Sequence, residues 1–171
     1  MFIQPSYGSS ETRRHWADTL DRPVPFHEQW YAEALTPEQR ERLAATHPSG
    51  AARFWGATAK HDRRMATLTA GDVVLLTGQK HVRAIGAVGC AFANDEFARR
   101  LWRPDPAKCL WRNVYSLRAY RHVMIRYEEV WALPGFTVND NFMGLRFLNE
   151  EKGATILSGL DVTRLLAANV P

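Results

Sequence analysis

Histidine, cysteine and acidic side chains are the residues most able to act as catalysts or metal ligands, but their spacing here favours neither role. None of the six histidines pairs with another histidine or a cysteine at metal-ligand spacing. The chain also lacks Gly-x-Ser-x-Gly, a Walker loop, His-Glu-x-x-His and the Cys-x-x-Cys of zinc deaminases. The acidic residues, such as Glu38 and Glu41, fall mostly in helical segments where exposure to solvent explains them. We therefore expect no catalytic residue, no metal site and no cofactor.

The six tryptophans offer a different chemistry, because an accessible indole ring can stack on a nucleic-acid base. Trp16 and Trp30 lie beside apolar neighbours in helical segments, and Trp131 lies in a similar setting, so these three are expected in the core. Trp55 ends a short apolar stretch directly before Gly56, where the backbone permits a close approach. Trp55 is therefore a candidate for base binding.

Trp102 is the second candidate, and basic residues surround it. It ends a helical segment just before a loop that contains prolines, and Trp111 opens a strand and is held in reserve. An aromatic ring beside cations suits stacking on a base while the phosphates are neutralised. The net charge of +4 permits a polyanionic partner without requiring one. The phosphate-binding candidates are Arg63, Arg64, Arg99, Arg100 and Arg103.

The elements that position these residues change from helical to strand-like near residue 50. Gly86 and Gly89 lie inside one predicted strand and indicate a bulge or a barrel bend. A capping box, Thr36-Pro37-Glu38-Gln39, begins one helix, and Asn94 is expected to cap another. Gly78-Gln79-Lys80 is predicted to be the turn of a hairpin. Helices are predicted at 11–20, 27–35, 37–46, 95–102, 127–133 and within 149–168, and strands at 2–7, 53–58, 72–77, 82–91, 110–117, 122–125 and 145–148.

These elements predict one α+β domain over residues 1–171, a mixed β-barrel of about five to six strands surrounded by helices. A helical insertion is expected at about 11–48 and C-terminal helices at about 149–168. No apolar run approaches the roughly 20 residues of a membrane span, and no signal peptide opens the chain. We expect a cytoplasmic protein whose two cysteines, Cys90 and Cys109, are buried free thiols.

Five short segments of the chain form a recognisable series. In chain order they are Phe-Trp-Gly-Ala-Thr (54–58), Ala-Gly-Asp-Val-Val-Leu-Leu-Thr-Gly (70–78), Ile-Gly-Ala-Val-Gly (85–89), Ala-Arg-Arg-Leu-Trp (98–102) and Trp-Arg-Asn-Val-Tyr-Ser-Leu (111–117). This series resembles the EVE and YTH branch of the PUA-like superfamily, whose small β-barrels hold a modified base in an aromatic cage. The resemblance covers about residues 50–150, with the first strand at 2–7. Several of the segments are closer still to EVE-like modules that accompany HNH nucleases and other modification-dependent restriction systems.

The resemblance implies where a base would bind. In YTH domains a tryptophan at the end of the second strand forms one wall of the cage, and Trp55 matches that position. The second wall comes from a later loop, where this chain has Trp102, with Trp111 as the alternative. YTH domains read the base edge with a polar residue after the first strand, but here a helical insertion of roughly 40 residues follows that strand. The cage candidates are Trp55, Trp102, Trp111 and Tyr7, and the edge or backbone candidates are Ser6, Gly56, Ala57 and Asn113.

These expectations describe a non-catalytic reader of modified DNA that binds a flipped 5-methylcytosine, or a related modified cytosine, between Trp55 and Trp102. Its partner would be double-stranded DNA, with a nuclease domain or subunit completing a restriction system. A reader of N6-methyladenine or of modified RNA is the alternative within the same class. An enzyme, or a regulatory domain that binds a small molecule on the same barrel, is the alternative of another class. Turnover of a nucleic acid would favour the enzyme, and steeply salt-dependent binding without turnover would favour the reader.

Overall fold

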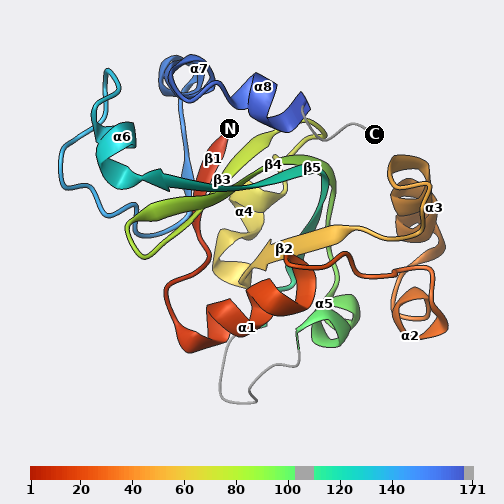
Figure 1. Ribbon diagram of the computed structural model, residues 1–171. Helices are drawn as coiled ribbons and strands as arrows, with labels where there is room; N and C mark the ends of the chain where they lie inside the picture. The colour runs from red at the N-terminus through yellow and green to blue at the C-terminus, as the bar shows by residue number, and fades with distance from the viewer. Residues whose placement is uncertain (103–109, 168–171) are drawn as a thin grey trace. The chain divides into compact units, whose positions relative to one another are not determined.

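The computed structural model describes residues 1–102 and 110–167, and its fold class is the predicted α+β. Six strands form one mixed sheet in the order β2-β5-β4-β3-β1-β6 (Figure 1). The strands are β1 (Phe2–Pro5), β2 (Arg53–Ala57), β3 (Val73–Gly78), β4 (His81–Ala93), β5 (Asn113–Arg126) and β6 (Arg146–Phe147). The helices are α1 (Ser10–Thr19), α2 (Gln29–Ala32), α3 (Pro37–Thr46), the 3-10 turn η1 (Ala59–His61), α4 (Asp62–Met65), α5 (Asp95–Leu101), α6 (Tyr127–Trp131), α7 (Glu150–Gly159) and α8 (Val162–Ala167).

The chain divides into two compact units that share the long strands β4 and β5. The first unit comprises Met1–Arg13, Asp72–Ala87 and the chain from Ala119 onward. The second unit comprises Arg14–Gly71 and Val88–Arg118. Each unit is described below by itself.

The first unit is built on strand β1, which pairs on both of its edges. Phe2 lies opposite Val74 in the parallel pairing with β3 and opposite Phe147 in the antiparallel pairing with β6. Strands β3 and β4 form the predicted hairpin, whose turn residues Gln79 and Lys80 have positive φ angles of 52° and 61°. Two consecutive positive φ angles are typical of the type I′ turn, which matches the twist of paired strands. The core of this unit includes Ile3, Leu75, Ile85, Tyr127, Phe142, Ile156 and Val162.

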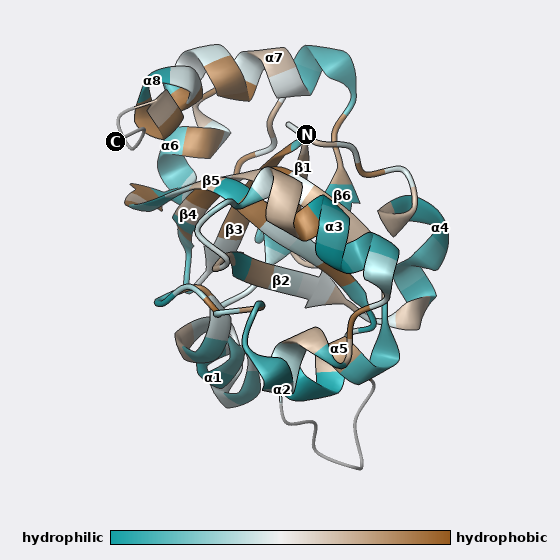
Figure 2. Cartoon of the chain, turned by 90° about the vertical axis from the view of Figure 1, so that its right-hand side faces the viewer, coloured by the Kyte–Doolittle hydropathy of each residue, from teal (hydrophilic) through white to brown (hydrophobic). Residues whose placement is uncertain are grey.

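The second unit packs helices against the pairing of β2 with β5. Trp55 lies opposite Tyr115 in this antiparallel pair. Phe54 meets Phe97 of α5 edge to face, with ring centroids 5.2 Å apart. Figure 2 colours α1 as mostly hydrophilic, in agreement with its exposed polar residues. The core of this unit therefore comes from one face of each helix and from the strands, and it includes Val24, Phe26, Leu35, Leu43, Phe54, Phe97 and Leu101.

Local capping fixes where two helices of the second unit begin. The predicted capping box is present at α3, where the backbone N–H of Gln39 donates to Thr36 Oγ1 at 3.2 Å and the Gln39 side chain accepts from the Thr36 N–H. Asn94 caps α5, since its Oδ1 accepts from the Phe97 N–H at 2.9 Å. Its Nδ2 also donates to Ala34 O and to Gln39 Oε1. One side chain thus starts α5 and joins it to α3.

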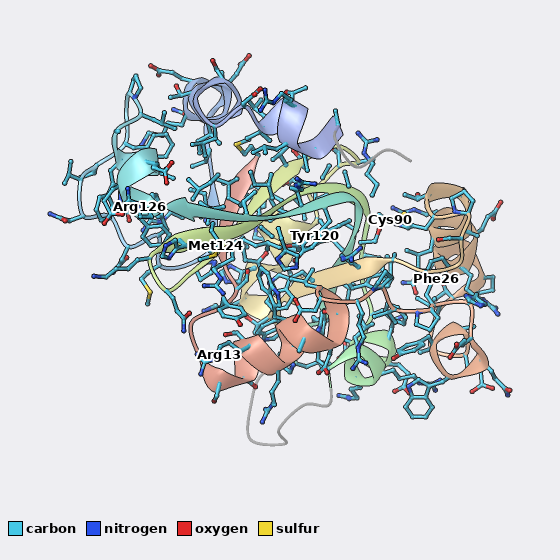
Figure 3. All side chains as sticks on the ribbon, viewed as in Figure 1. Arg13, Phe26, Cys90, Tyr120, Met124 and Arg126 are labelled. Carbon is cyan, nitrogen blue, oxygen red and sulfur yellow. The ribbon has the colours of Figure 1, made fainter. Side chains whose placement is uncertain are left out.

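Strand β5 differs from the sequence prediction, because it is one continuous strand rather than two. Its first five residues are buried, whereas burial alternates over its second half. Tyr120 is buried, while Met124 and Arg126 are exposed (Figure 3). A strand that is buried on both faces at one end and on one face at the other changes its hydrophobic pattern midway. That change of pattern, and not a break in the backbone, produced the prediction of two strands.

Candidate functional site

Trp55 packs with three other tryptophans, and one histidine joins this group of rings, all in the second unit. Trp55 is fully buried, and its ring meets those of Trp16, Trp102 and Trp111 edge to face. The three centroid distances are 6.0, 6.3 and 5.1 Å. The His15 ring lies 4.9 Å from that of Trp111, also edge to face. These arrangements are the preferred ones for aromatic pairs, and we call the five residues the tryptophan cluster.

Trp102 is held in the cluster by a hydrogen bond and by a glycine. Its Nε1 donates to Thr19 Oγ1 at 3.1 Å, and the Thr19 hydroxyl donates in turn to the carbonyl oxygen of His15. A Cβ atom added at Gly56 would lie only 2.8 Å from Trp102 Cη2 and 2.8 Å from the carbonyl oxygen of Asn113. Gly56 therefore allows the Trp102 ring to approach strand β2, and its contact with a base stays a prediction.

The structure brings three predicted cage residues together, but their rings are in mutual contact. The planes of Trp55 and Trp102 are inclined by 79°, so they do not form two parallel walls. Trp102 is only 2% exposed, whereas Trp111 is half-buried. Trp111 is thus the ring of the three that borders solvent. Base binding by these three residues stays a prediction.

A buried polar atom at the centre of the cluster has no hydrogen-bond partner among the residues that the structure describes. It is the indole Nε1 of Trp55, which is fully buried. The Nε1 of the neighbouring Trp16, by contrast, donates to Asp21 Oδ1 at 2.8 Å. A buried donor without a partner costs about 1–3 kcal/mol, and such groups are rare in native proteins. Thr58 Oγ1, just beyond the end of β2, is a second such atom.

Asn113 lies outside the tryptophan cluster and joins β5 to α4. Its Nδ2 donates to the carbonyl oxygen of Thr58 at 3.1 Å and to Asp62 Oδ1 at 2.7 Å. Beside it, a cavity of about 300 Å³ opens between α4 and the two long strands. Ala57, at the end of β2, is buried and lies opposite Asn113 in the sheet. The cavity is lined by Asp62, Met65, Ala66, Leu68, Ala91, Phe92, Ala93, Asn113 and Val114.

Ser6 and Tyr7, the candidates after the first strand, belong to the first unit. Ser6 is fully buried, and its hydroxyl donates to the carbonyl oxygen of Gln4 at 2.8 Å. The Arg83 guanidinium lies over the Tyr7 ring, 4.2 Å from the ring centroid. Both side chains thus have contacts within the first unit. The predicted roles of Ser6 and Tyr7 in base reading stay predictions.

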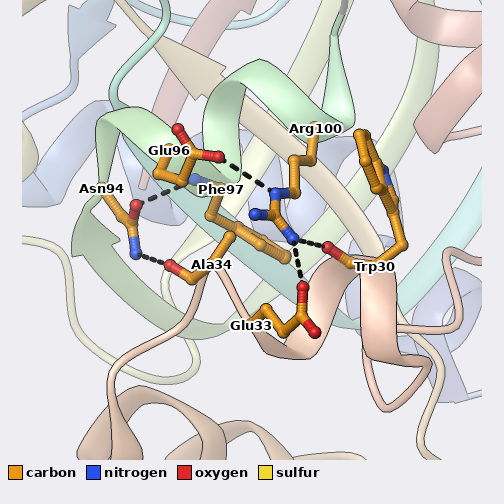
Figure 4. Close-up of polar contacts among 7 residues, drawn as sticks. All are labelled: Trp30, Glu33, Ala34, Asn94, Glu96, Phe97 and Arg100. Atoms are coloured by element: carbon orange, nitrogen blue, oxygen red, sulfur yellow. Dashed lines mark hydrogen bonds and ion pairs between the residues drawn. The ribbon is translucent and has the colours of Figure 1, made fainter.

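The candidate arginines differ in their exposure and in their ion pairs. Arg63 and Arg64 on α4 and Arg99 on α5 are exposed. The Arg100 guanidinium instead lies between Glu33 and Glu96, at 3.6 Å and 3.1 Å, as Figure 4 shows. Its charge is therefore compensated within the protein. Arg103 lies outside the described residues. Phosphate binding by any of these arginines stays a prediction.

Neither a metal site nor a membrane span is found in the described parts of the chain. Over residues 1–102 and 110–167, no three histidine, cysteine, aspartate or glutamate side chains are grouped so that they could hold a metal ion. Within the same residues, no helix has the length and apolar character needed to cross a bilayer. Cys90 is a buried free thiol, as predicted, whereas Cys109 lies outside the described residues.

Comparison with known proteins supports the fold. No family model matches the sequence, and no curated protein matches it. The structure is similar to the solved N-terminal domain of McrB from Thermococcus gammatolerans bound to m5C DNA, with a TM-score of 0.66 and 14% sequence identity. The match covers 94% of this chain and 96% of that one. The α+β, PUA-like fold predicted from the five short sequence segments is therefore confirmed at the level of the fold.

Proposed function

We propose that this chain reads a modified base in DNA, holding a flipped 5-methylcytosine, or a related modified cytosine, in the tryptophan cluster. The similarity in fold to a domain solved with m5C DNA supports this proposal. The gathering of four indole rings around one point of the second unit supports it from within the chain. The proposal covers binding without turnover, and the partner is a DNA duplex.

The observation that carries the proposal is the buried, unpartnered Nε1 of Trp55. An indole N–H can only donate a hydrogen bond, so its partner must be an acceptor. A cytosine base offers acceptors on its pairing edge, and the edge is freed when the base leaves the duplex. A base placed against Trp55 would therefore supply the hydrogen bond that the described residues of the protein do not.

A base can reach Trp55 only if one of the neighbouring rings moves. Trp102 is held by Thr19 and is almost fully buried, whereas Trp111 is half-buried and borders solvent. Displacing Trp111 removes less apolar surface from contact than displacing Trp102, and so costs less. We therefore assign Trp111 as the movable wall. The base would then lie between Trp111 and Trp55, with Trp102 closing the far side.

The magnitudes are consistent with a reader that uses stacking. Flipping a base out of a duplex costs a few kcal/mol. Stacking on an aromatic side chain contributes about 1–3 kcal/mol per base, and phosphate contacts add to it. The methyl group itself contributes only about 0.8 kcal/mol when buried. Preference for the modified base thus depends on a close fit around the methyl group, which rigid indole rings provide.

The test is binding to matched duplexes that carry cytosine, 5-methylcytosine, adenine or N6-methyladenine, each at a low and a high salt concentration. Trp55→Phe keeps an apolar ring but removes the N–H, so affinity for the modified duplex should fall about two- to twelvefold. Trp131→Phe is the matched control, because Trp131 lies outside the cluster and its Nε1 already donates to the Asp140 carbonyl. The control should leave DNA binding unchanged.

Each outcome separates the candidates. Preference for the 5-methylcytosine duplex that weakens in Trp55→Phe supports the proposal. Preference for the N6-methyladenine duplex would show that the chain reads modified adenine instead of modified cytosine. Equal binding to all four duplexes, unaffected by the substitution, rejects the cluster as a reading site. Chemical change of the DNA during the assay would instead favour an enzyme. A nuclease partner within a restriction system is part of the proposal and is tested by cleavage of modified DNA in the presence of that partner.

A further inference from the structure

A second surface of the same unit remains unexplained by the tryptophan cluster. It is a groove of about 860 Å³ that extends from α1 across the α1–α2 connection to α5. We infer that this groove binds the phosphodiester backbone of the DNA strand beside the flipped base, with the exposed Trp30 stacking on a neighbouring base. This inference rests on the proposed function. The groove is lined by Arg14, His15, Asp18, Arg22, Pro23, Val24, Pro25, Glu28, Trp30, Tyr31, Arg99, Arg100 and Leu101.

The charge of the groove suits a polyanion. Four arginines line it against two carboxylates, those of Asp18 and Glu28. Arg14, Arg22 and Arg99 are exposed. A guanidinium presents five N–H donors in a planar fork that matches phosphate oxygens. The three exposed arginines outnumber the two carboxylates, so the lining is complementary to the charge of a phosphodiester strand.

Trp30 is the feature that distinguishes this groove from an ordinary basic surface. Its side chain is 60% exposed, although tryptophan is among the residues that gain most from burial. The Arg100 guanidinium lies over the indole ring, 4.8 Å from its centroid, and also donates to the Trp30 carbonyl oxygen (Figure 4). Glu33 and Glu96 hold that guanidinium from two sides. The ring is therefore fixed in an exposed position, so little conformational entropy is lost when a base stacks on it.

The groove also reaches the tryptophan cluster. His15 lines the groove, and its ring contacts those of Trp102 and Trp111 at centroid distances of 6.0 and 4.9 Å. Leu101, at the other end of the lining, directly precedes Trp102 in the chain. A strand whose flipped base occupies the cluster would thus continue into the groove. The exposed arginines would contact its phosphates, and Trp30 would meet a base on the same strand.

The experiment compares the full chain with Trp30→Ala, with the double variant Arg14→Gln and Arg99→Gln, and with Arg40→Gln as the control. Arg40 is an exposed arginine of the same unit outside the groove. Trp30→Ala should weaken binding to modified and unmodified duplexes alike, by about 5-fold to about 150-fold, because stacking does not depend on the base modification. The double variant should reduce the slope of log affinity against log salt by about 1.8, and the control should change neither quantity.

The two proposals fail in different ways. The groove inference is supported when Trp30→Ala lowers affinity while the ratio of modified to unmodified binding stays as in the unaltered chain. Unchanged affinity in Trp30→Ala and an unchanged salt slope in the double variant would overturn it, even where Trp55→Phe lowers the ratio and the reader proposal stands. Self-association of the chain that Trp30→Ala abolishes, with DNA binding intact, would also overturn it and assign the groove to a protein partner.

Discussion

Replacing Gly56 with alanine tests whether the tryptophan cluster is packed as tightly as its geometry indicates. The added Cβ would lie 2.8 Å from Trp102 Cη2 and 2.8 Å from the carbonyl oxygen of Asn113. The carbonyl oxygen belongs to the backbone of the paired strand β5, so it cannot turn aside as a flexible side chain could. Both the strand pairing and the Trp102 ring must therefore shift to accommodate one methyl group.

The cost follows from these two contacts. Overpacking in a filled core costs about 1–3 kcal/mol. The smaller conformational entropy of alanine in the unfolded chain offsets about 0.4–1 kcal/mol of that cost. We expect Gly56→Ala to lower the free energy of unfolding by about 1–2 kcal/mol, which corresponds to a fall in Tm of about 2–8 °C for a chain of this length.

The assay is thermal unfolding followed by circular dichroism and, in parallel, by tryptophan fluorescence, which reports the displacement of Trp102. Gly153→Ala is the matched control. Gly153 lies within α7, and a Cβ there would meet only Met1 Cβ at 3.8 Å, an ordinary contact. Alanine is favoured over glycine inside a helix by about 0.5–1 kcal/mol, so the control should raise Tm. A Gly56→Ala variant as stable as the unaltered chain would refute the tight packing of Trp102 against β2.

Two further predictions concern buried polar groups. Burial lowers the pKa of His47 below its ordinary value of 6.5, and its Nε2 lies 2.9 Å from Ser116 Oγ. The unfolded chain therefore binds the proton more tightly, so the free energy of unfolding should be highest above pH 6.5 and fall as the pH drops below 6.5. Urea unfolding at several pH values should show this fall, and the His47→Gln variant should show a smaller one. Trp16→Phe removes an N–H that donates a hydrogen bond to Asp21, whereas Trp55→Phe removes an N–H without a partner among the described residues. Trp16→Phe should therefore be the less stable of the two variants by about 1 kcal/mol in urea unfolding, and equal stabilities would argue that the Trp55 N–H has a partner in solution.

Local sequence signals located most of the elements correctly. The capping box at Thr36 and the cap at Asn94 depend only on residues within one helical turn, and both are present as predicted. The hairpin at 78–80 and the apolar run of β3 are equally local. Helix α2 is shorter than expected, at four residues, because capping and periodicity constrain a short segment only weakly. Only the tertiary structure shows that a Cβ at Gly89 would lie 2.8 Å from Ser116 Oγ, a close approach that keeps this strand position small.

The candidate site likewise has features that the sequence predicted and features that only the structure shows. The sequence by itself identified Trp55, Gly56, Trp102 and Trp111 as residues of interest, since a tryptophan next to a glycine or a loop is visible in a linear chain. It placed Trp30 in the core, which is wrong, because Trp30 lies on a short helix where Arg100 covers its ring and leaves it 60% exposed.

The tertiary structure alone decided how these residues combine. It brought Trp16 of α1 to the ring of Trp55, some 40 positions away, and His15 to the ring of Trp111, still farther along the chain. It left Arg99 exposed while placing its neighbour Arg100 between two glutamates. Sequence patterns show which residue types are present and how they repeat. The pairing of charges and the packing of aromatic rings depend on distances between segments far apart in the chain, and a sequence pattern does not contain those distances. The sequence thus determined which residue types could bind a ligand, and the fold determined which of these residues are exposed and which are buried or paired.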